Sequence, residues 1–140
     1  MSLDDNKALA QRAVSLWVSG TKDDPGAFVT ADYRNHQESD IHGGVQVLGL
    51  AELRGLLKEF HAAFSEVRIA SHMRIAEGDL VATRVEMEAR HTGSLVKETP
   101  TGKVVTWTGV EIVRIADGKV AESWADWDKY GMFQQIGLLP

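Results

Sequence analysis

The chain has 140 residues, 44% hydrophobic and 25% charged, with a formal net charge of −5 and no cysteine. This balance predicts one cytoplasmic globular domain over residues 1–140, and the lack of cysteine excludes disulfides and thiolate chemistry. The negative charge argues against nucleic-acid binding, the acidic N-terminus is unlike a secretory signal, and no apolar run reaches the ~18 residues of a membrane span.

The first half of the chain shows mainly helical patterns. Apolar residues at helical spacing, with capping residues before them, predict three helices, over residues 4–19, 23–30 and 49–64. Between the last two come a short extended piece, 32–37, and a loop, 38–48. The helix over 49–64 has the clearest pattern, because its leucines and phenylalanines form one apolar stripe that suits packing against a sheet.

The second half of the chain alternates between apolar and polar residues, as strands do. Turn signals and one loop, 92–103, separate four predicted strands, over residues 67–76, 80–91, 104–115 and 119–127. A short helix follows over 129–137. Helices followed by long antiparallel strands predict the α+β class, with a curved sheet and helices packed on one face.

Two polar residues stand out on strand faces that are otherwise apolar. His91 ends the apolar face of strand 80–91, where it would be either a hydrogen-bonded core histidine or a proton shuttle. Glu111 is the acid on one apolar face of strand 104–115. Burial would raise its pKa and make it an acid/base group, whereas an arginine partner or exposure to solvent would not. The opposite face of this strand is also apolar, which predicts a subunit interface.

The turn before the last strand leaves two registers open. A two-residue turn places Glu111 opposite Trp124. A three-residue turn with Gly118 as a bulge shifts the register by one residue, so that Glu111 faces Ser123 and Ala125, and Trp127 joins the wall of a pocket. Because such a slip exchanges the two faces of the whole strand, both arrangements remain possible from the pattern alone.

Four segments of the chain, taken together and in this order, form a fairly specific sequence pattern. They are "YRNHQ" (33–37), "RHTGSL" (90–95), "TPTGKVVTWTGVEIVRIADGKVAESW" (99–124) and "DKYGMFQQIG" (128–137). They resemble the SnoaL-like proteins, the polyketide ester cyclases, which have a nuclear-transport-factor-2-like fold. The resemblance implies a cone-shaped sheet wrapped by helices around a deep apolar cavity for a small apolar ligand. It also implies a homodimer, no metal and no organic cofactor.

The resemblance also implies where the chemistry of such cyclases would fall. They close a ring by intramolecular aldol condensation, using an Asp on the last strand and a His on the strand before it. These positions correspond to Ala125 and Glu111, so the usual pair is missing, while Asp128 matches an acid at the strand–helix junction. Glu111, or Asp126 in the first register, would then supply the replacement carboxylate.

The candidate site can be stated as two groups of residues. The catalytic candidates are Glu111, His91, Asp126 and Asp128, although Asp128 precedes a helix and suits an N-cap. The residues expected to contact ligand are Trp17, Tyr33, Asn35, His36, Phe60, Trp107, Trp124 and Trp127. No metal site is expected, since His36, Asp40, His42 and His91 lack a metal-binding signature.

The expected function is cofactor-free acid/base chemistry on a small apolar carbonyl compound, either an aldol cyclisation or an isomerisation. A non-catalytic small-molecule binder is the first alternative, and Ala125 favours it. A cofactor-free hydrolase or dehydratase is the second, because one fold hosts several chemistries.

Overall fold

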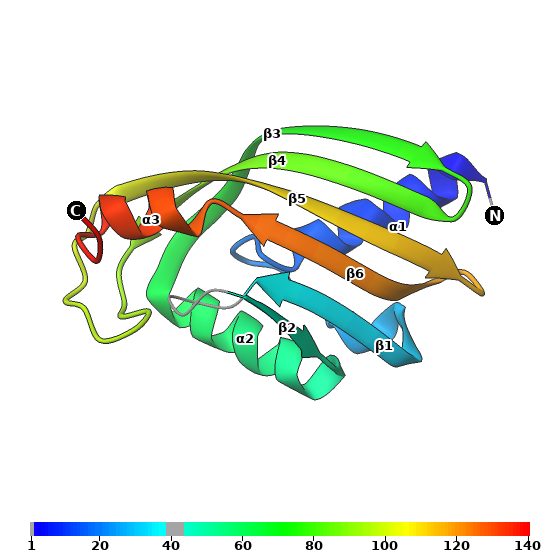
Figure 1. Ribbon diagram of the computed structural model, residues 1–140, viewed down its shortest axis with the longest axis horizontal. Coiled ribbons are helices and arrows are strands. Elements are labelled where there is room, and N and C mark those ends of the chain that lie inside the picture. The colour runs from blue at the N-terminus through cyan, green and yellow to red at the C-terminus, as the bar shows by residue number, and fades with distance from the viewer. Residues whose placement is uncertain (1, 39–43) are drawn as a thin grey trace.

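The computed structural model describes residues 2–38 and 44–140. Over these residues the chain forms, in order, α1 (Leu3–Ser15), the 3₁₀ turn η1 (Pro25–Ala27), β1 (Val29–Glu38), β2 (Val45–Leu48), α2 (Leu50–Ala63), β3 (Phe64–Glu77), β4 (Leu80–His91), β5 (Val104–Ala116), β6 (Lys119–Trp127) and α3 (Lys129–Gln135) (Figure 1). None of the described helices is long and apolar enough to cross a membrane.

The helices begin and end where local chemistry favours it. Ser2 and Asp5 form a capping box at the start of α1, which satisfies backbone N–H groups that the first turn leaves free. The helix expected over 23–30 is only the short turn η1, capped by the side chain of Asp24. In α2 the apolar stripe is buried as predicted, with Leu53 and Leu57 facing the core.

The strands form one six-stranded sheet in the order β2-β1-β6-β5-β4-β3. Neighbouring strands are antiparallel except for β1 and β6, which run parallel. The sequence predicts the four strands β3 to β6 but no parallel pair. It also assigns 38–48 to a loop, whereas β2 occupies Val45–Leu48; residues 39–43 lie outside the described part of the chain.

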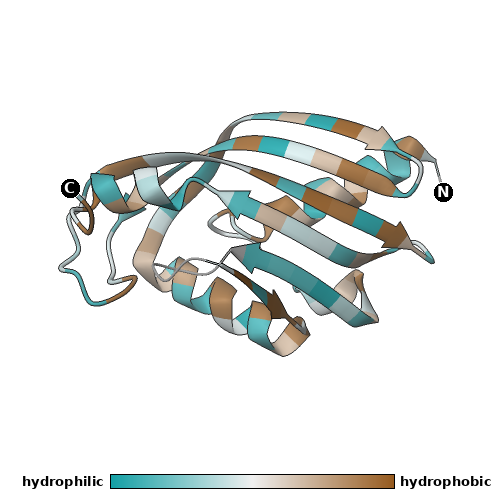
Figure 2. Ribbon diagram, in the orientation of Figure 1, coloured by the Kyte–Doolittle hydropathy of each residue, from teal (hydrophilic) through white to brown (hydrophobic). Residues whose placement is uncertain are grey.

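The sheet is curved, and α1 and α2 cover its concave face (Figure 1). Along β4 and β5 buried and exposed residues alternate, and the same alternation of hydropathy is visible along the strands in Figure 2. The core therefore lies between the concave face and the helices, as the α+β prediction requires.

The last hairpin combines features of both predicted registers. Asp117 and Gly118 both have positive φ, 52° and 72°, as a two-residue type I′ turn requires. The ladder then contains one extra residue in β6, Ala121, which shifts the register by one. Glu111 consequently pairs with Ala125. The predicted two-residue turn is thus present, but the register that it implied is wrong.

Candidate functional site

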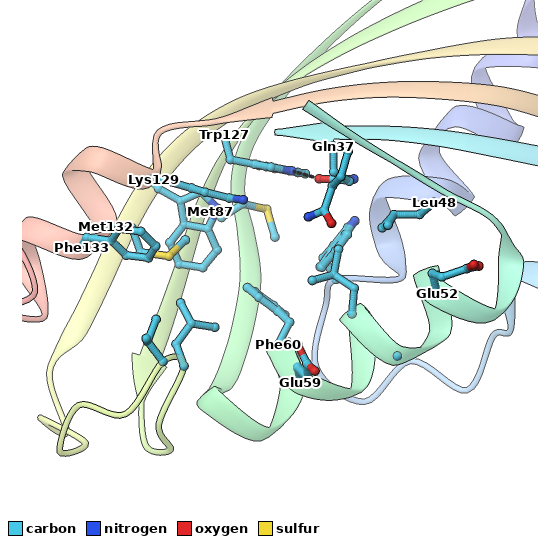
Figure 3. Close-up of a pocket in the computed structure, with 17 residues that line it drawn as sticks. Gln37, Leu48, Glu52, Glu59, Phe60, Met87, Trp127, Lys129, Met132 and Phe133 are labelled. Atoms are coloured by element: carbon cyan, nitrogen blue, oxygen red, sulfur yellow. Dashed lines mark hydrogen bonds between the residues drawn. The ribbon is translucent and has the colours of Figure 1, made fainter. Parts of the chain in front are cut away.

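A cavity of about 450 Å³ lies between the concave face of the sheet, α2, α3 and residues Leu95 and Val96 (Figure 3). Four of the predicted ligand-contacting residues line it: Trp17, Phe60, Trp107 and Trp127. Their rings touch one another edge to face, with centroids 5.1 Å apart for Trp17 and Phe60 and 5.9 Å apart for Trp17 and Trp127. Such a wall suits a flat apolar ligand.

One buried polar side chain lines this aromatic cavity. Gln37 of β1 is 2% exposed, and its Oε1 accepts a hydrogen bond of 3.1 Å from Nε1 of Trp127 (Figure 3). Nε2 of Gln37 has no partner among the described residues. Gln37 is not among the site residues predicted from the sequence. Its signal is the alternation of Tyr33, Asn35 and Gln37, which places all three on one face of β1.

Glu111 lies beside the cavity on the concave face. Strand pairing sets Thr83, Glu111, Ala125 and Gln37 in one row across four strands. Glu111 is 4% exposed, and burial raises its pKa to about 8. Its Oε1 has no partner within residues 2–38 and 44–140. Of the two interpretations that the sequence left open, burial of this carboxyl group is confirmed.

The carboxyl group of Glu111 is set back from the cavity. It is not among the residues that line the cavity, whereas its row neighbour Gln37 and the adjacent Trp127 are. The ring of Trp127 packs directly over Gly109, where any side chain would collide with it. Glycine at 109 therefore lets the ring approach the sheet closely next to the Glu111 row.

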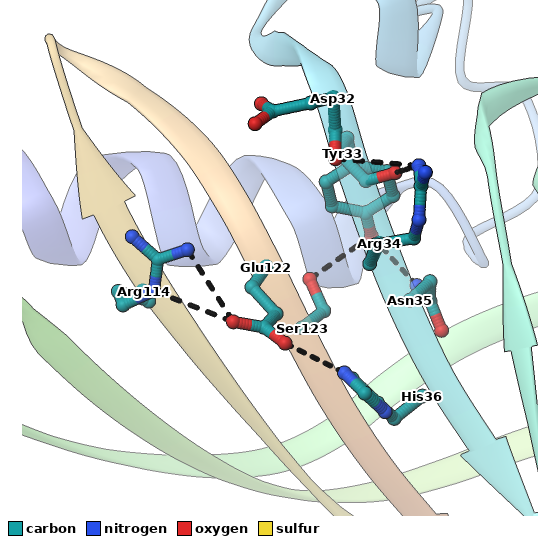
Figure 4. A network of polar contacts seen from close by, with 8 residues as sticks. All are labelled: Asp32, Tyr33, Arg34, Asn35, His36, Arg114, Glu122 and Ser123. Atoms are coloured by element: carbon teal, nitrogen blue, oxygen red, sulfur yellow. Dashed lines mark hydrogen bonds and ion pairs between the residues drawn. The ribbon is translucent and has the colours of Figure 1, made fainter.

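A buried polar cluster adjoins Glu111. The hydroxyl of Tyr33 donates to Oγ of Ser123 at 2.9 Å and accepts from Nδ2 of Asn35 at 2.7 Å (Figure 4). Burial, and after it the charge of Glu111, raise the pKa of Tyr33. Tyr33 and Asn35 thus lie near the acid, but they do not line the cavity.

His91 is fully buried and anchors the loop 92–103. The backbone N–H of Thr101 donates to its Nδ1 at 3.1 Å, so that nitrogen is an acceptor. Nε2 therefore carries the hydrogen and donates to Oε1 of Glu98 at 3.0 Å. His91 does not line the cavity, and this arrangement matches the core histidine that the sequence allowed rather than a proton shuttle.

Three predicted site residues lie on the opposite, convex face. His36 stacks on Trp124, with ring centroids 5.3 Å apart, and its Nε2 contacts Oε2 of Glu122 at 2.7 Å (Figure 4). Asp126 pairs with Val110 on the same face and is exposed. The register set by Ala121 turns Asp126 and Trp124 to this face, and His36 lies there because it alternates with Asn35 and Gln37 along β1. This corrects the expectation of Asp126 as a replacement acid and of His36 and Trp124 as ligand contacts.

Asp128 caps α3. Its side chain accepts a hydrogen bond of 2.9 Å from the backbone N–H of Gly131, as expected for an acid before a helix. Within the described residues, no group of three or more His, Cys, Asp or Glu side chains is arranged to hold a metal ion. Asp40 and His42 lie outside the described residues.

Comparisons with known proteins agree with this architecture. The model of the SnoaL-like polyketide cyclase family matches residues 7–136. The nogalonic acid methyl ester cyclase of Streptomyces nogalater is 34% identical over 128 residues, covering 89% of this chain and 91% of that protein.

Solved structures give the same picture. AclR, a proposed hydroxylase from Streptomyces galilaeus, superposes with a TM-score of 0.85 and 27% identity, over 99% of this chain and 85% of its own. A protein with a ketosteroid isomerase-like fold from Catenulispora acidiphila superposes with a TM-score of 0.69 and 14% identity, over 94% and 93%. The latter likeness supports the fold alone.

Proposed function

The chain belongs to the SnoaL-like polyketide cyclase family, and from this premise we propose that it catalyses proton transfer, without a cofactor, on a planar apolar carbonyl compound. The cavity of about 450 Å³ would hold the compound between aromatic rings. The similarity to an ester cyclase over most of both chains supports cyclisation as the reaction type.

The buried carboxyl group of Glu111 beside the cavity is the observation that carries the proposal. With a pKa of about 8, its carboxyl group is populated in both protonation states near neutral pH, which is the condition for efficient acid/base catalysis. The carboxylate would remove a proton from the carbon next to a carbonyl. When the resulting enolate attacks a second carbonyl, the same proton returns to the new alkoxide oxygen. An isomerisation would instead return it to another carbon, and neither path needs an oxidant.

The neighbourhood of Ala125 explains how Glu111 could replace the usual acid. The resemblance places the cyclase Asp at Ala125, and Glu111 is the residue paired with it on β5. Adjacent strands lie about 4.8 Å apart. Glu is one methylene longer than Asp, and Ala125 leaves only a methyl group in the way. Both features favour the reach of Glu111 toward the Gln37 side of the row.

A non-catalytic binding protein is the second candidate function. Two observations favour binding without catalysis: Glu111 does not line the cavity, and Ala125 carries no functional group. The hydrolase and dehydratase alternatives would also use Glu111, and they share its requirement for access to the ligand.

Deuterium exchange into 2-tetralone, a planar aromatic ketone with acidic C–H bonds, tests the proposal. The protein should accelerate exchange in D₂O, and Glu111→Gln should lower the protein-dependent rate by roughly 10²- to 10⁴-fold, the usual contribution of a positioned acid/base. Glu52→Gln is the matched control, because Glu52 lines the cavity but is exposed. Full exchange in the Glu111→Gln variant, or none with the wild-type protein, would contradict catalysis by Glu111.

A further inference from the structure

We infer that Gln37 is the hydrogen-bond donor that selects a ligand carbonyl oxygen in this cavity. The inference rests on the proposed function only in taking the cavity as the ligand site, and it holds for an enzyme and for a binding protein alike. It adds a specificity-determining residue on β1 to the aromatic wall.

The orientation of the Gln37 amide follows from its partner. An indole N–H can only donate a hydrogen bond. The Gln37 atom that meets Nε1 of Trp127 is therefore the oxygen, and the contact of 3.1 Å holds it there. The amide nitrogen, Nε2, must point the other way. Gly109 leaves room for the ring of Trp127 against the sheet, and the contact between Trp127 and Gln37 sets the direction of the Gln37 donor before any ligand arrives.

The donor so fixed lacks an acceptor. Nε2 of Gln37 is buried and has no partner among the described residues, although buried N–H groups in native proteins nearly always have one. Because Gln37 lines the cavity, an oxygen atom of a bound ligand can supply the missing acceptor. Oδ1 of Asn35, on the same face of β1, is also buried without a partner in this part of the chain, so a bridging water is the competing occupant.

The surroundings favour a neutral carbonyl over an anionic oxygen. The rings of Trp17 and Trp127 form part of the wall. Of the described residues that line the cavity, Glu52 and Glu59 are acidic and Lys129 is basic. A ligand carboxylate or phosphate would meet this excess of negative charge as it enters. The geometry points to a planar ring system whose ketone-type oxygen meets Nε2 of Gln37.

The test compares two planar probes, 9-fluorenone and fluorene, which differ only by C=O in place of CH₂. The wild-type protein should bind fluorenone roughly tenfold more tightly in equilibrium dialysis, because only the ketone satisfies the buried donor. Gln37→Met should bring the affinity ratio close to one while fluorene affinity is kept. Gln134→Met is the control, since Gln134 is an exposed glutamine of α3 that does not line the cavity, and it should keep the ratio.

A second measurement uses the wild-type protein alone, so it does not depend on whether the Gln37→Met variant folds. In the ¹⁵N NMR spectrum of the wild-type protein, the side-chain amide of Gln37 should shift on addition of fluorenone and stay in place with fluorene. Equal affinities for the two probes, or an unchanged Gln37 resonance, would overturn the inference and favour a bridging water. A Gln37→Met variant that keeps the preference would do the same.

The two proposals can fail separately. Fluorenone has no exchangeable C–H next to its carbonyl, so its binding does not depend on proton transfer. If Glu111→Gln keeps both the affinity ratio and full exchange into 2-tetralone, the proposed catalysis fails and the role of Gln37 stands. If exchange depends on Glu111 but the ratio is one, the catalytic proposal stands and this one fails.

Discussion

The burial of Glu111 has a measurable cost that depends on pH. Its pKa is about 8 in the folded protein and near 4.5 when unfolded. Between these values the unfolded chain releases the proton and the folded chain keeps it. The free energy of unfolding therefore falls by about 1.4 kcal/mol per pH unit from this group, is unaffected by it below pH 4.5, and levels off above pH 8.

Glu111→Gln should remove this pH dependence. Because a neutral amide does not ionise, the variant should gain stability relative to the wild-type protein as the pH rises from 5 to 8. Urea denaturation at pH 5, 7 and 9 measures the difference. Glu52→Gln should follow the wild-type curve, since Glu52 is exposed. Parallel curves for Glu111→Gln and wild type would show that the carboxyl group ionises normally in the folded state.

For single residues, the sequence identifies Glu111 as a candidate acid but does not predict whether its carboxyl group is buried. An acid on an apolar strand face is visible in the pattern, whereas burial depends on neighbours from other strands. Gln37 could not be found in the same way. Its partner Trp127 is 90 residues away, and the relevant pairing joins β1 to β6, a parallel contact that local patterns do not report.

Among the elements, the loop 92–103 is anchored by a buried contact between His91 and Glu98. Glu98 accepts backbone N–H bonds from Leu95, Val96 and Lys97 in addition to the bond from His91. Burial alone would raise the pKa of Glu98, but these backbone bonds outweigh it and lower the pKa to about 2. Since Leu95 and Val96 line the cavity, the contact also shapes the ligand site.

Glu98→Ala should release this loop without unfolding the sheet. The loss of the acceptor for the partly buried donors of His91 and Leu95 should lower the free energy of unfolding by about 1–3 kcal/mol. It should also speed tryptic cleavage after Lys97 by at least roughly tenfold, because opening of the loop exposes its backbone. Glu66→Ala, which breaks the exposed ion pair with Arg90, should change neither quantity appreciably. Equal cleavage rates in all three proteins would refute the anchoring role.

The last hairpin shows why an element can be predicted and its register missed. Asp117-Gly118 is a local signal, and the turn forms as the signal indicates. The bulge at Ala121 has no comparable signature. It lies where β6 must pair with β5 on one side and with β1 on the other. The faces of Asp126 and Trp127 are therefore set by tertiary pairing, beyond what the turn sequence specifies.

For the whole molecule, the four-segment resemblance predicted the cone-shaped α+β fold that the strands alone suggested only in outline. The comparisons confirm the family, while assembly stays a prediction. The convex face of the sheet is relevant to assembly. One row of paired residues crosses all six strands on this face: Ile75, Ala82, Ile112, Trp124, His36 and Val47. Except for His36 the row is apolar, and Ile75 and Val47 are 66% and 55% exposed. So continuous an apolar surface predicts an interaction site.

We expect a second copy of this chain to cover the convex face, in line with the subunit interface predicted from the sequence. Ile112 lies in the middle of the row, so Ile112→Lys would bury an unpaired charge in the interface and should convert a dimer into a monomer. Sedimentation velocity at low micromolar concentration distinguishes the two. Leu3→Lys is the control, since Leu3 is 48% exposed on α1, away from this face, and it should leave the dimer intact. A wild-type monomer at that concentration, or an Ile112→Lys variant that remains dimeric, would exclude this interface.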